Sequence, residues 1–419
     1  MKESTMNRFA CILLLVAAAP VRSEQGSPAA IDLPRPTGPY AVGRVSYDWI
    51  DTTRPEVLAK APNTHREIIV DVWYPAAPLL GASTAPYLPN AEKIEKSSYA
   101  RFEEHWWRKA WPMVVSGSIH TRAFENASFV SGDRRFPLIT FSHGYSVEPA
   151  GYTHQIEELV SHGYVIAAIH HTYEVAVTVF PDGRMIPFSV ENSRGQDSPT
   201  IEAYRAWEKK RVDVWAADFR FTLVQIIRLN ADAAQKAPFS GRIDIRQAGA
   251  FGHSFGGLAA ARACSLDPRI GACINQNGVG LDGSIPHYGE GHMPAHPYLY
   301  FSEMHGPGSD TASQDGKAQH EQMEKELREC LSDTYDVSIG TPGFEHMSFA
   351  DFSFLQATGN PEEPSNALKS LQVAEAYTIA FFDKFLKGSK DTLLDRDSGK
   401  NGEIAIKHYG GRSGAKASR

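Results

Sequence analysis

The chain has 419 residues, enough for one large α/β domain or two small ones. With 42% hydrophobic and 22% charged residues, its composition is that of an ordinary globular protein. The formal net charge of −7 predicts neither nucleic acid nor an anionic membrane surface as a partner.

The N-terminus is predicted to be a signal peptide, residues 1–23. Lys2 and Arg8 form its basic region, and the apolar run Ala10–Pro20 is too short to span a membrane. The small residue Ser23 is suited to the last position before cleavage. No later run approaches the roughly 18 apolar residues of a membrane-spanning helix. The mature protein is therefore predicted to be soluble and exported, either secreted or periplasmic.

Three cysteines remain after the predicted signal peptide: Cys264, Cys273 and Cys330. An odd number leaves at least one thiol free. Cys264 and Cys273 are predicted to lie on a helix and on the next strand, where small buried cysteines are common. The sequence therefore favours packing over a disulfide for this pair.

Composition divides the rest of the chain into three parts, the second of which holds an insertion. Residues 24–43 are rich in Pro, Gly and Ser and are predicted to be an extended segment, followed by a main domain at 44–390. Within that domain, residues 91–125 have a helical pattern with several tryptophans, which predicts an inserted cap over an active site. The alternative is that these tryptophans only pack the segment onto the body. Residues 391–419 are rich in Gly, Ser and Lys and are predicted to be a mobile tail.

Strands and helices alternate through the main domain. The predicted strands are Arg44–Ile50, Glu67–Tyr74, Phe136–Phe141, Gly163–Ile169, Ile243–Phe251, Ile270–Asn275, Tyr298–Phe301 and Asp336–Ile339. The predicted helices are Tyr152–His162, Ile201–Asn230, Leu258–Cys264 and Ser365–Leu386. This alternation predicts an α/β fold with a mostly parallel central sheet and helices on both faces.

One stretch carries the pattern of a nucleophile elbow, Gly252-His253-Ser254-Phe255-Gly256. It lies between a predicted strand and a predicted helix, as that motif requires. Glycines two residues before and after the serine let the strand and the helix approach each other, so that the serine hydroxyl stands exposed. The Phe255 N–H would then point to where an oxyanion forms. The alternative is a glycine-rich turn with an ordinary serine.

A serine nucleophile needs a base and a second oxyanion donor. His346 lies in a loop after the predicted strand that ends at Ile339, where α/β-hydrolases carry the histidine. The loop after Phe136–Phe141 contains Gly144, which would let the Tyr145 N–H converge with that of Phe255. The alternative for this loop is an ordinary strand-to-helix turn.

Four other histidines are close in sequence but lack the spacing of a metal site. They are His287, His292, His296 and His305. The sequence therefore predicts no metal and no other cofactor.

Several motifs follow one another in a family-specific order. They are Trp73-Tyr74-Pro75, Phe141-Ser142-His143-Gly144, Ser161-His162-Gly163-Tyr164, the elbow with Gly257, Asp267-Pro268-Arg269, and Glu345-His346-Met347-Ser348-Phe349-Ala350-Asp351-Phe352. On these motifs the chain resembles the plasma-type platelet-activating-factor acetylhydrolases, with dienelactone-hydrolase and polyester-hydrolase relatives. The resemblance implies an α/β-hydrolase fold in which Ser254 is the nucleophile and His346 the base. It also implies an oxyanion hole formed by the amides of Tyr145 and Phe255.

The chain departs from that family at the catalytic acid, because Asn277 occupies the position of the aspartate. An amide can orient a histidine but supplies no charge to stabilise the imidazolium. Two nearby carboxylates are alternatives. Asp282 lies five residues on in a Gly-rich loop and is the first choice, and Glu303 follows the predicted strand Tyr298–Phe301. Asn277 as a neutral orienter is the third possibility.

The predicted function is that of an exported serine hydrolase of carboxylic esters, acting through an acyl-enzyme without a cofactor. The resemblance suggests short acyl chains, such as acetyl groups on lipids or small esters. Three rival hypotheses stay open. They are a polyester or lactone hydrolase with the same catalytic residues, a catalytically weakened binding protein marked by Asn277, and an interaction role for the tryptophan-rich segment.

Overall fold

The structure of the chain is a computed structural model. It describes residues 30–78, 80–97, 110–189, 199–280, 295–304, 314–330, 332–357, 363–390, 392–396 and 403–410. Three predictions concern residues outside these ranges: the signal peptide, the role of Asp282, and the part of the cap that contains Trp106 and Trp107. They stay predictions. In the part that the structure describes, no helix is long and apolar enough to cross a membrane.

A single large sheet forms the centre of the molecule. Along it the described strands follow the order β1-β5-β2-β3-β8-β7-β11-β12-β13-β14-β15, with β4 beside β5 and β6 beside β3. The six strands from β8 to β14 are parallel neighbours. Strand β3 runs antiparallel to β2 and β8, and β15 runs antiparallel to β14, whereas β2 and β5 are parallel. A small ribbon pairs β9 with β10. The predicted mostly parallel sheet is confirmed.

The strand bounds are as follows: β1 Ile31–Asp32, β2 Ala41–Pro55, β3 His65–Ala77, β4 Thr84–Pro86, β5 Ile119–Glu125, β6 Ser128–Phe129, β7 Phe136–Ser142, β8 Val165–His170, β9 Val177–Val179, β10 Met185–Pro187, β11 Ile243–His253, β12 Ile270–Gln276, β13 Tyr298–Glu303, β14 Thr334–Ile339 and β15 Ile404–Tyr409. All eight predicted strands are present among them.

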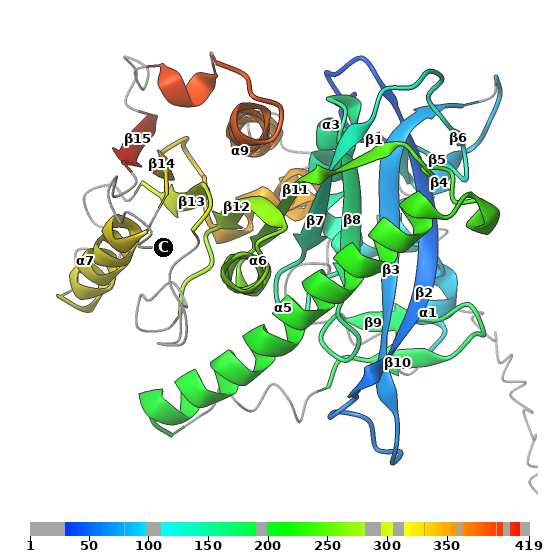
Figure 1. The fold of residues 1–419 in the computed structure, drawn as a ribbon, viewed down its shortest axis with the longest axis horizontal. Coiled ribbons are helices and arrows are strands. Elements are labelled where there is room, and N and C mark those ends of the chain that lie inside the picture. The colour runs from blue at the N-terminus through cyan, green and yellow to red at the C-terminus, as the bar shows by residue number, and fades with distance from the viewer. Residues whose placement is uncertain are drawn as a thin grey trace, which may run out of the picture.

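Helices cover both faces of the sheet (Figure 1). One face packs on α5 (Ile201–Ala231), α6 (Phe255–Leu266) and α7 (Gln314–Glu329). The other packs on α3 (Thr153–Ser161), α8 (Asp351–Ala357) and α9 (Glu363–Phe385), together with the short α1 (Ala91–Glu95) and α2 (Trp111–Val115). The sheet is therefore the middle layer of three.

Strand β7 illustrates why the sheet is buried on both sides. All seven of its residues are buried. Because side chains alternate along a strand, Phe136 and Leu138 join the core under α5 and α6. Ile139 and Phe141 join the core under α3 and α9. Such an apolar run on both faces is typical of a central parallel strand.

Two short strands lie where the sequence predicted other structure. The predicted helical segment 91–125 contains α1 and α2 but ends in β5, whose residues alternate between buried and more exposed positions. That two-residue period is the pattern of a strand, and Gly117 at φ 69° ends the preceding helix. In the predicted tail, β15 pairs with β14 over residues 404–409.

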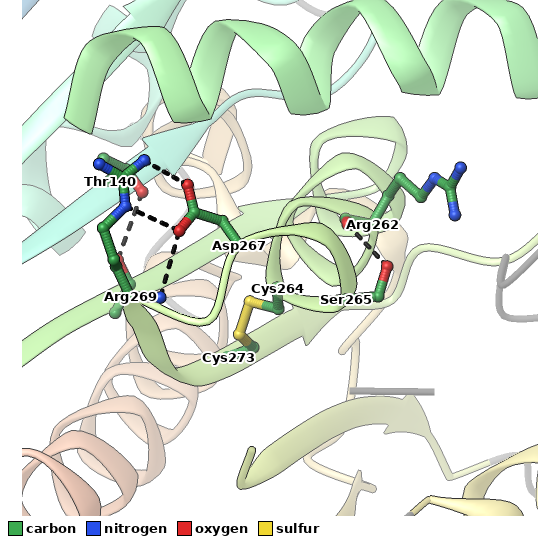
Figure 2. The surroundings of a disulfide bond; sticks show 8 residues. Thr140, Arg262, Cys264, Ser265, Asp267, Arg269 and Cys273 are labelled. Carbon is green, nitrogen blue, oxygen red and sulfur yellow. Dashed lines mark hydrogen bonds and ion pairs between the residues drawn. A yellow bond between two sulfur atoms is a disulfide. The ribbon is translucent and has the colours of Figure 1, made fainter. Parts of the chain in front are cut away.

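The preference for packing over a disulfide was wrong. Cys264 near the end of α6 is bonded to Cys273 on β12 (Figure 2). Their Cα atoms are 6.5 Å apart, which is within the range that a disulfide spans. The turn between them is closed by Asp267, whose carboxylate accepts hydrogen bonds from Arg269, as Figure 2 also shows. Cys330 is a buried free thiol.

Candidate active site

Ser254 lies in a strained turn between β11 and α6, as the elbow motif predicts. Its backbone angles are φ 55° and ψ −124°, a conformation that residues other than glycine rarely adopt. A Cβ atom added to Gly252 would lie 2.3 Å from the Gly256 carbonyl oxygen. One added to Gly256 would lie 2.4 Å from the Ser142 carbonyl oxygen. Both glycines are therefore required by the packing.

His346 reaches Ser254 from the loop after β14. The loop turns into a short 3₁₀-helix, His346–Phe349, whose start is fixed because the Glu345 N–H donates to Ser348 Oγ at 3.0 Å. The His346 Nε2 atom is 2.9 Å from Ser254 Oγ. The structure thus brings together the two residues that the sequence selected as nucleophile and base.

The partner of His346 on its other side is Asn277. Its Oδ1 atom lies 2.6 Å from His346 Nδ1, a distance at which Nδ1–H donates to the amide oxygen. With the proton held on Nδ1, Nε2 is left to accept from the serine hydroxyl. Of the three alternatives from the sequence, Asn277 is the one that occupies this position. Glu303 ends β13 beside Ile339, and the first choice, Asp282, lies outside the described residues.

The turn that carries Asn277 explains how an amide comes to lie there. Asn277 has φ 56°, in the left-handed region that asparagine tolerates better than most residues. The preceding Asn275 closes the turn, because its Oδ1 accepts from the Gly278 N–H at 2.7 Å and its Nδ2 donates to the Gly278 carbonyl at 2.8 Å. A Cβ at Gly278 would meet the Ser254 carbonyl at 2.2 Å, so this turn also packs against the elbow.

Burial lowers the pKa of His346 below its usual value. A carboxylate at the position of Asn277 would act in the opposite direction, by stabilising the imidazolium. The site therefore holds a base that stays neutral to lower pH than a histidine paired with an aspartate.

The two predicted oxyanion donors lie side by side next to Ser254. Phe255 is the first residue of α6, and the first N–H groups of a helix have no acceptor within it. The loop after β7 passes close to the serine, since a Cβ on Gly144 would lie 3.5 Å from Ser254 Cβ. The rings of Tyr145 and Phe255 are 5.3 Å apart between their centres. Tyr145 and Phe255 therefore lie close together beside Ser254. Their role as oxyanion donors stays a prediction.

A second set of hydrogen-bonded hydroxyl, imidazole and carboxylate groups begins at Ser142, the last residue of β7, directly before the loop that carries Tyr145. Ser142 Oγ lies 2.8 Å from His171 Nε2, and His171 Nδ1 lies 2.8 Å from Asp218 Oδ2. Ser142, His171 and Asp218 are all fully buried. Burial lowers the pKa of His171, so the neutral ring accepts from Ser142 and donates to Asp218. Arg66 and Arg54 hold the Asp218 carboxylate as the charged form.

Sequence reasoning did not select this supporting set. The signal that could have found it is Asp218 itself, a charged residue in the apolar stripe of α5 between Trp215 and Phe219. A buried carboxylate in such a stripe needs partners, and here Arg54 on β2, Arg66 on β3 and His171 just after β8 supply them. The Trp215 ring stacks on His171 with centres 3.8 Å apart.

The described residues hold no group of three or more side chains suited to a metal ion. Of the four histidines noted in the sequence, only His296 lies among them.

Comparisons with known proteins point to ester hydrolases. The family model described as platelet-activating factor acetylhydrolase, isoform II, matches residues 25–187. A protein of Arthroderma benhamiae named "probable 1-alkyl-2-acetylglycerophosphocholine esterase" is 23% identical over 399 residues, covering 90% of this chain and 94% of that protein. The platelet-activating factor acetylhydrolase of Cavia porcellus is 24% identical over 376 residues, covering 84% and 78%.

Among solved structures, a ferulic acid esterase from Streptomyces cinnamoneus superposes with a TM-score of 0.66 at 25% identity. The superposition covers 90% of this chain and 99% of that one. These similarities confirm the resemblance that the motifs indicate. The chain is therefore a carboxylic ester hydrolase with the α/β-hydrolase fold, similar to the platelet-activating factor acetylhydrolases.

Proposed function

We propose that the protein is an exported serine esterase that cleaves short-chain acyl esters through an acyl-enzyme. The observation that carries the proposal is the chain of two hydrogen bonds from Ser254 Oγ to His346 Nε2 and from His346 Nδ1 to Asn277 Oδ1, at 2.9 Å and 2.6 Å. A strained, accessible serine bonded to an oriented imidazole is the arrangement that activates a hydroxyl for attack.

In the proposed reaction, Ser254 Oγ attacks the ester carbonyl while His346 Nε2 takes the hydroxyl proton. The N–H groups of Phe255 and Tyr145 stabilise the oxyanion of the tetrahedral intermediate. His346 then gives its proton to the leaving alcohol, and the acyl group stays on Ser254. A water molecule activated by His346 releases the acid. Asn277 keeps the ring oriented with the proton on Nδ1 throughout.

Aromatic rings beside Ser254 favour substrates with an apolar part. The half-buried Trp207 has its ring centre 5.8 Å from that of Tyr145 and 6.0 Å from that of Phe255. The names of the relatives point to two ester classes, an acetyl ester of an alkyl glycerophosphocholine and an ester of ferulic acid. We place the acetyl ester first because the sequence relatives are named as an acetylglycerophosphocholine esterase and a platelet-activating factor acetylhydrolase.

The disulfide supports export. Structural disulfides persist in oxidising compartments and are rare where thiols are kept reduced. The Cys264–Cys273 bond joins two buried side chains, which is the arrangement of a structural rather than a redox-active disulfide. It fits the predicted signal peptide at residues 1–23.

The test is covalent labelling of the purified protein with a fluorophosphonate, followed by peptide mapping. We expect the label on Ser254 and none on Ser142, because Ser254 is partly exposed whereas Ser142 is fully buried. Ser254→Ala should abolish both labelling and turnover. In parallel, kcat/KM should be highest for p-nitrophenyl acetate, lower for p-nitrophenyl octanoate and lowest for methyl ferulate.

Two results would contradict the proposal in different ways. No labelling of the folded protein would favour the weakened binding protein that Asn277 suggests. Labelling with faster turnover of polyester films, lactones or methyl ferulate than of acetate would keep the mechanism and replace the substrate class.

A further inference from the structure

A chain of buried hydrogen bonds connects the three loops that form the active site. It begins at the Gly144 N–H in the loop after β7, which donates to Tyr152 Oη at 3.0 Å. Tyr152 Oη lies 2.8 Å from Nδ1 of His253, the residue before the nucleophile. His253 Nε2 lies 2.7 Å from the backbone carbonyl oxygen of His346. Each loop is thus tied to the next through one imidazole.

The direction of every bond in this chain is fixed by its ends. The His346 carbonyl can only accept, so His253 Nε2 carries the proton and Nδ1 is an acceptor. Tyr152 therefore donates its hydroxyl proton to His253 Nδ1 and accepts from the Gly144 N–H. A doubly protonated His253 would have no lone pair on Nδ1 to accept the Tyr152 hydroxyl proton.

Burial keeps His253 in the neutral form that this pattern needs. Both His253 and Tyr152 are fully buried. Burial together with the nearby His346 ring holds the pKa of His253 well below its usual range. The ring is also fixed sterically, since the His346 ring centre is 4.6 Å away and that of Phe349 is 5.3 Å away. His253 therefore has one protonation state and one ring position in this chain of hydrogen bonds.

The space around Gly144 makes the connection sensitive to small displacements. A Cβ at Gly144 would lie 3.2 Å from Tyr152 Oη and 3.3 Å from His253 Nδ1. Gly144 directly precedes Tyr145, so a shift of its peptide moves the Tyr145 N–H relative to Ser254. Oxyanion stabilisation depends on donors held at hydrogen-bond distance, and a displacement of about 1 Å can cost roughly 10²-fold in rate.

We propose that His253 and Tyr152 are positioning residues for the proposed esterase reaction. They hold the oxyanion loop and the backbone of His346 in a fixed relation to Ser254. This inference rests on the proposed function, because it assigns these residues a part in that reaction. Neither touches the substrate. Their removal should lower kcat while leaving KM and the fold nearly unchanged.

The first test is Tyr152→Phe, which removes one hydroxyl and leaves the ring in place. We expect kcat for p-nitrophenyl acetate to fall about ten- to a hundredfold, with KM within about twofold of wild type. Tyr164→Phe is the matched control. Tyr164 is equally buried and its hydroxyl donates to Asp383 at 2.6 Å, away from the chain of bonds at Ser254. It should keep the wild-type kcat.

Conservative variants of His253 separate the two bonds of the ring. The amide nitrogen of His253→Gln can replace Nε2–H as a donor to the His346 carbonyl, whereas the bond to Tyr152 is lost. His253→Gln should therefore resemble Tyr152→Phe. The double variant should be no slower than either single one, because all three break the same connection. His253→Phe removes both bonds and should be slower than His253→Gln.

Unfolding by guanidinium measured on each variant separates positioning from stability. A wild-type kcat for Tyr152→Phe would overturn the proposal. The proposal would also be overturned if Tyr152→Phe and Tyr164→Phe lost the same stability and the same kcat, because the loss of rate would then reflect stability alone. Ser254→Ala is measured beside them, and a wild-type protein without Ser254-dependent turnover would contradict the proposed function itself rather than this connection.

Discussion

At the scale of single residues, the sequence could predict the parts of the site that depend on local geometry. Ser254 is recognisable because two glycines flank it at fixed spacing, and His346 because it follows the last parallel strand. The partner of His346 could not be chosen in the same way. It depends on how the loop after β12 folds back beside the elbow, and this is set by the long-range pairing of β11 with β12. For that reason the sequence alone leaves Asn277, Asp282 and Glu303 as alternatives.

The contact between Asn277 and His346 predicts the pH dependence of the reaction. Because burial lowers the pKa of His346, its neutral form persists to lower pH, and kcat/KM should rise with pH through a midpoint below 6.5. Asn277→Asp places a carboxylate beside Nδ1 and raises that pKa, so the midpoint should move to higher pH. On the plateau, kcat should rise about tenfold, the equivalent of one pKa unit of imidazolium stabilisation.

Stopped-flow or steady-state pH profiles measure both effects. Glu303→Gln and Asp282→Asn are the comparisons, since each removes a carboxylate that the sequence offered as the acid. Neither should move the midpoint. A large loss of rate in one of them, with no response to Asn277→Asp, would reassign the residue that orients His346.

At the scale of secondary structure, prediction succeeded for the strands of the parallel core and failed for two strands toward the margins of the sheet and for α7. The strands of the parallel core are buried on both faces, so their apolar runs are unmistakable. Strands β5 and β15 lie toward the margins of the sheet, with partly exposed residues and weak patterns. The disulfide was missed because pairing of Cys264 with Cys273 requires α6 to end beside β12, which spacing alone does not reveal.

The disulfide predicts that reduction weakens the element that follows the nucleophile. It closes a loop between residues nine apart, and loop-closure entropy gives it about 3 kcal/mol of stabilisation. Guanidinium unfolding of the oxidised and reduced wild-type protein should differ by this amount. The double variant Cys264→Ala/Cys273→Ala should match the reduced protein and become insensitive to reductant, whereas Cys330→Ala should keep the full response. Equal midpoints for the oxidised and reduced wild type would contradict the expectation.

At the scale of the whole molecule, the continuous sheet joins segments far apart in the chain. Strand β1 near residue 31 lies at one end of the described sheet and β15 near residue 404 at the other. Strand β15 covers the edge of β14, the strand that leads to the His346 loop. The residues after 390, predicted from composition to be a tail, therefore include part of the fold. Composition reflects the Gly- and Ser-rich flanks rather than the six paired residues between them.

Truncation after Arg396 should therefore destabilise the protein and promote its association. The half-buried Ile404 and Ile406 are lost, at a cost of about 2 kcal/mol. The exposed edge of β14 is left free to pair with another molecule. Guanidinium unfolding and light scattering measure the two effects. Truncation after Gly410 keeps β15 and is the matched control. A monodisperse truncation at 396 with unchanged stability would show that β15 is dispensable.

The set Ser142, His171 and Asp218 has a consequence for identifying enzymes by side-chain geometry. A search for three such groups at catalytic distances would return this buried set as readily as the one at Ser254. Backbone and surroundings distinguish them, because Ser142 lies in a regular strand with no open side, whereas Ser254 stands at positive φ on a half-exposed turn. A template for recognising or designing a serine hydrolase should therefore specify the turn beneath the hydroxyl and the space above it, in addition to the three side chains.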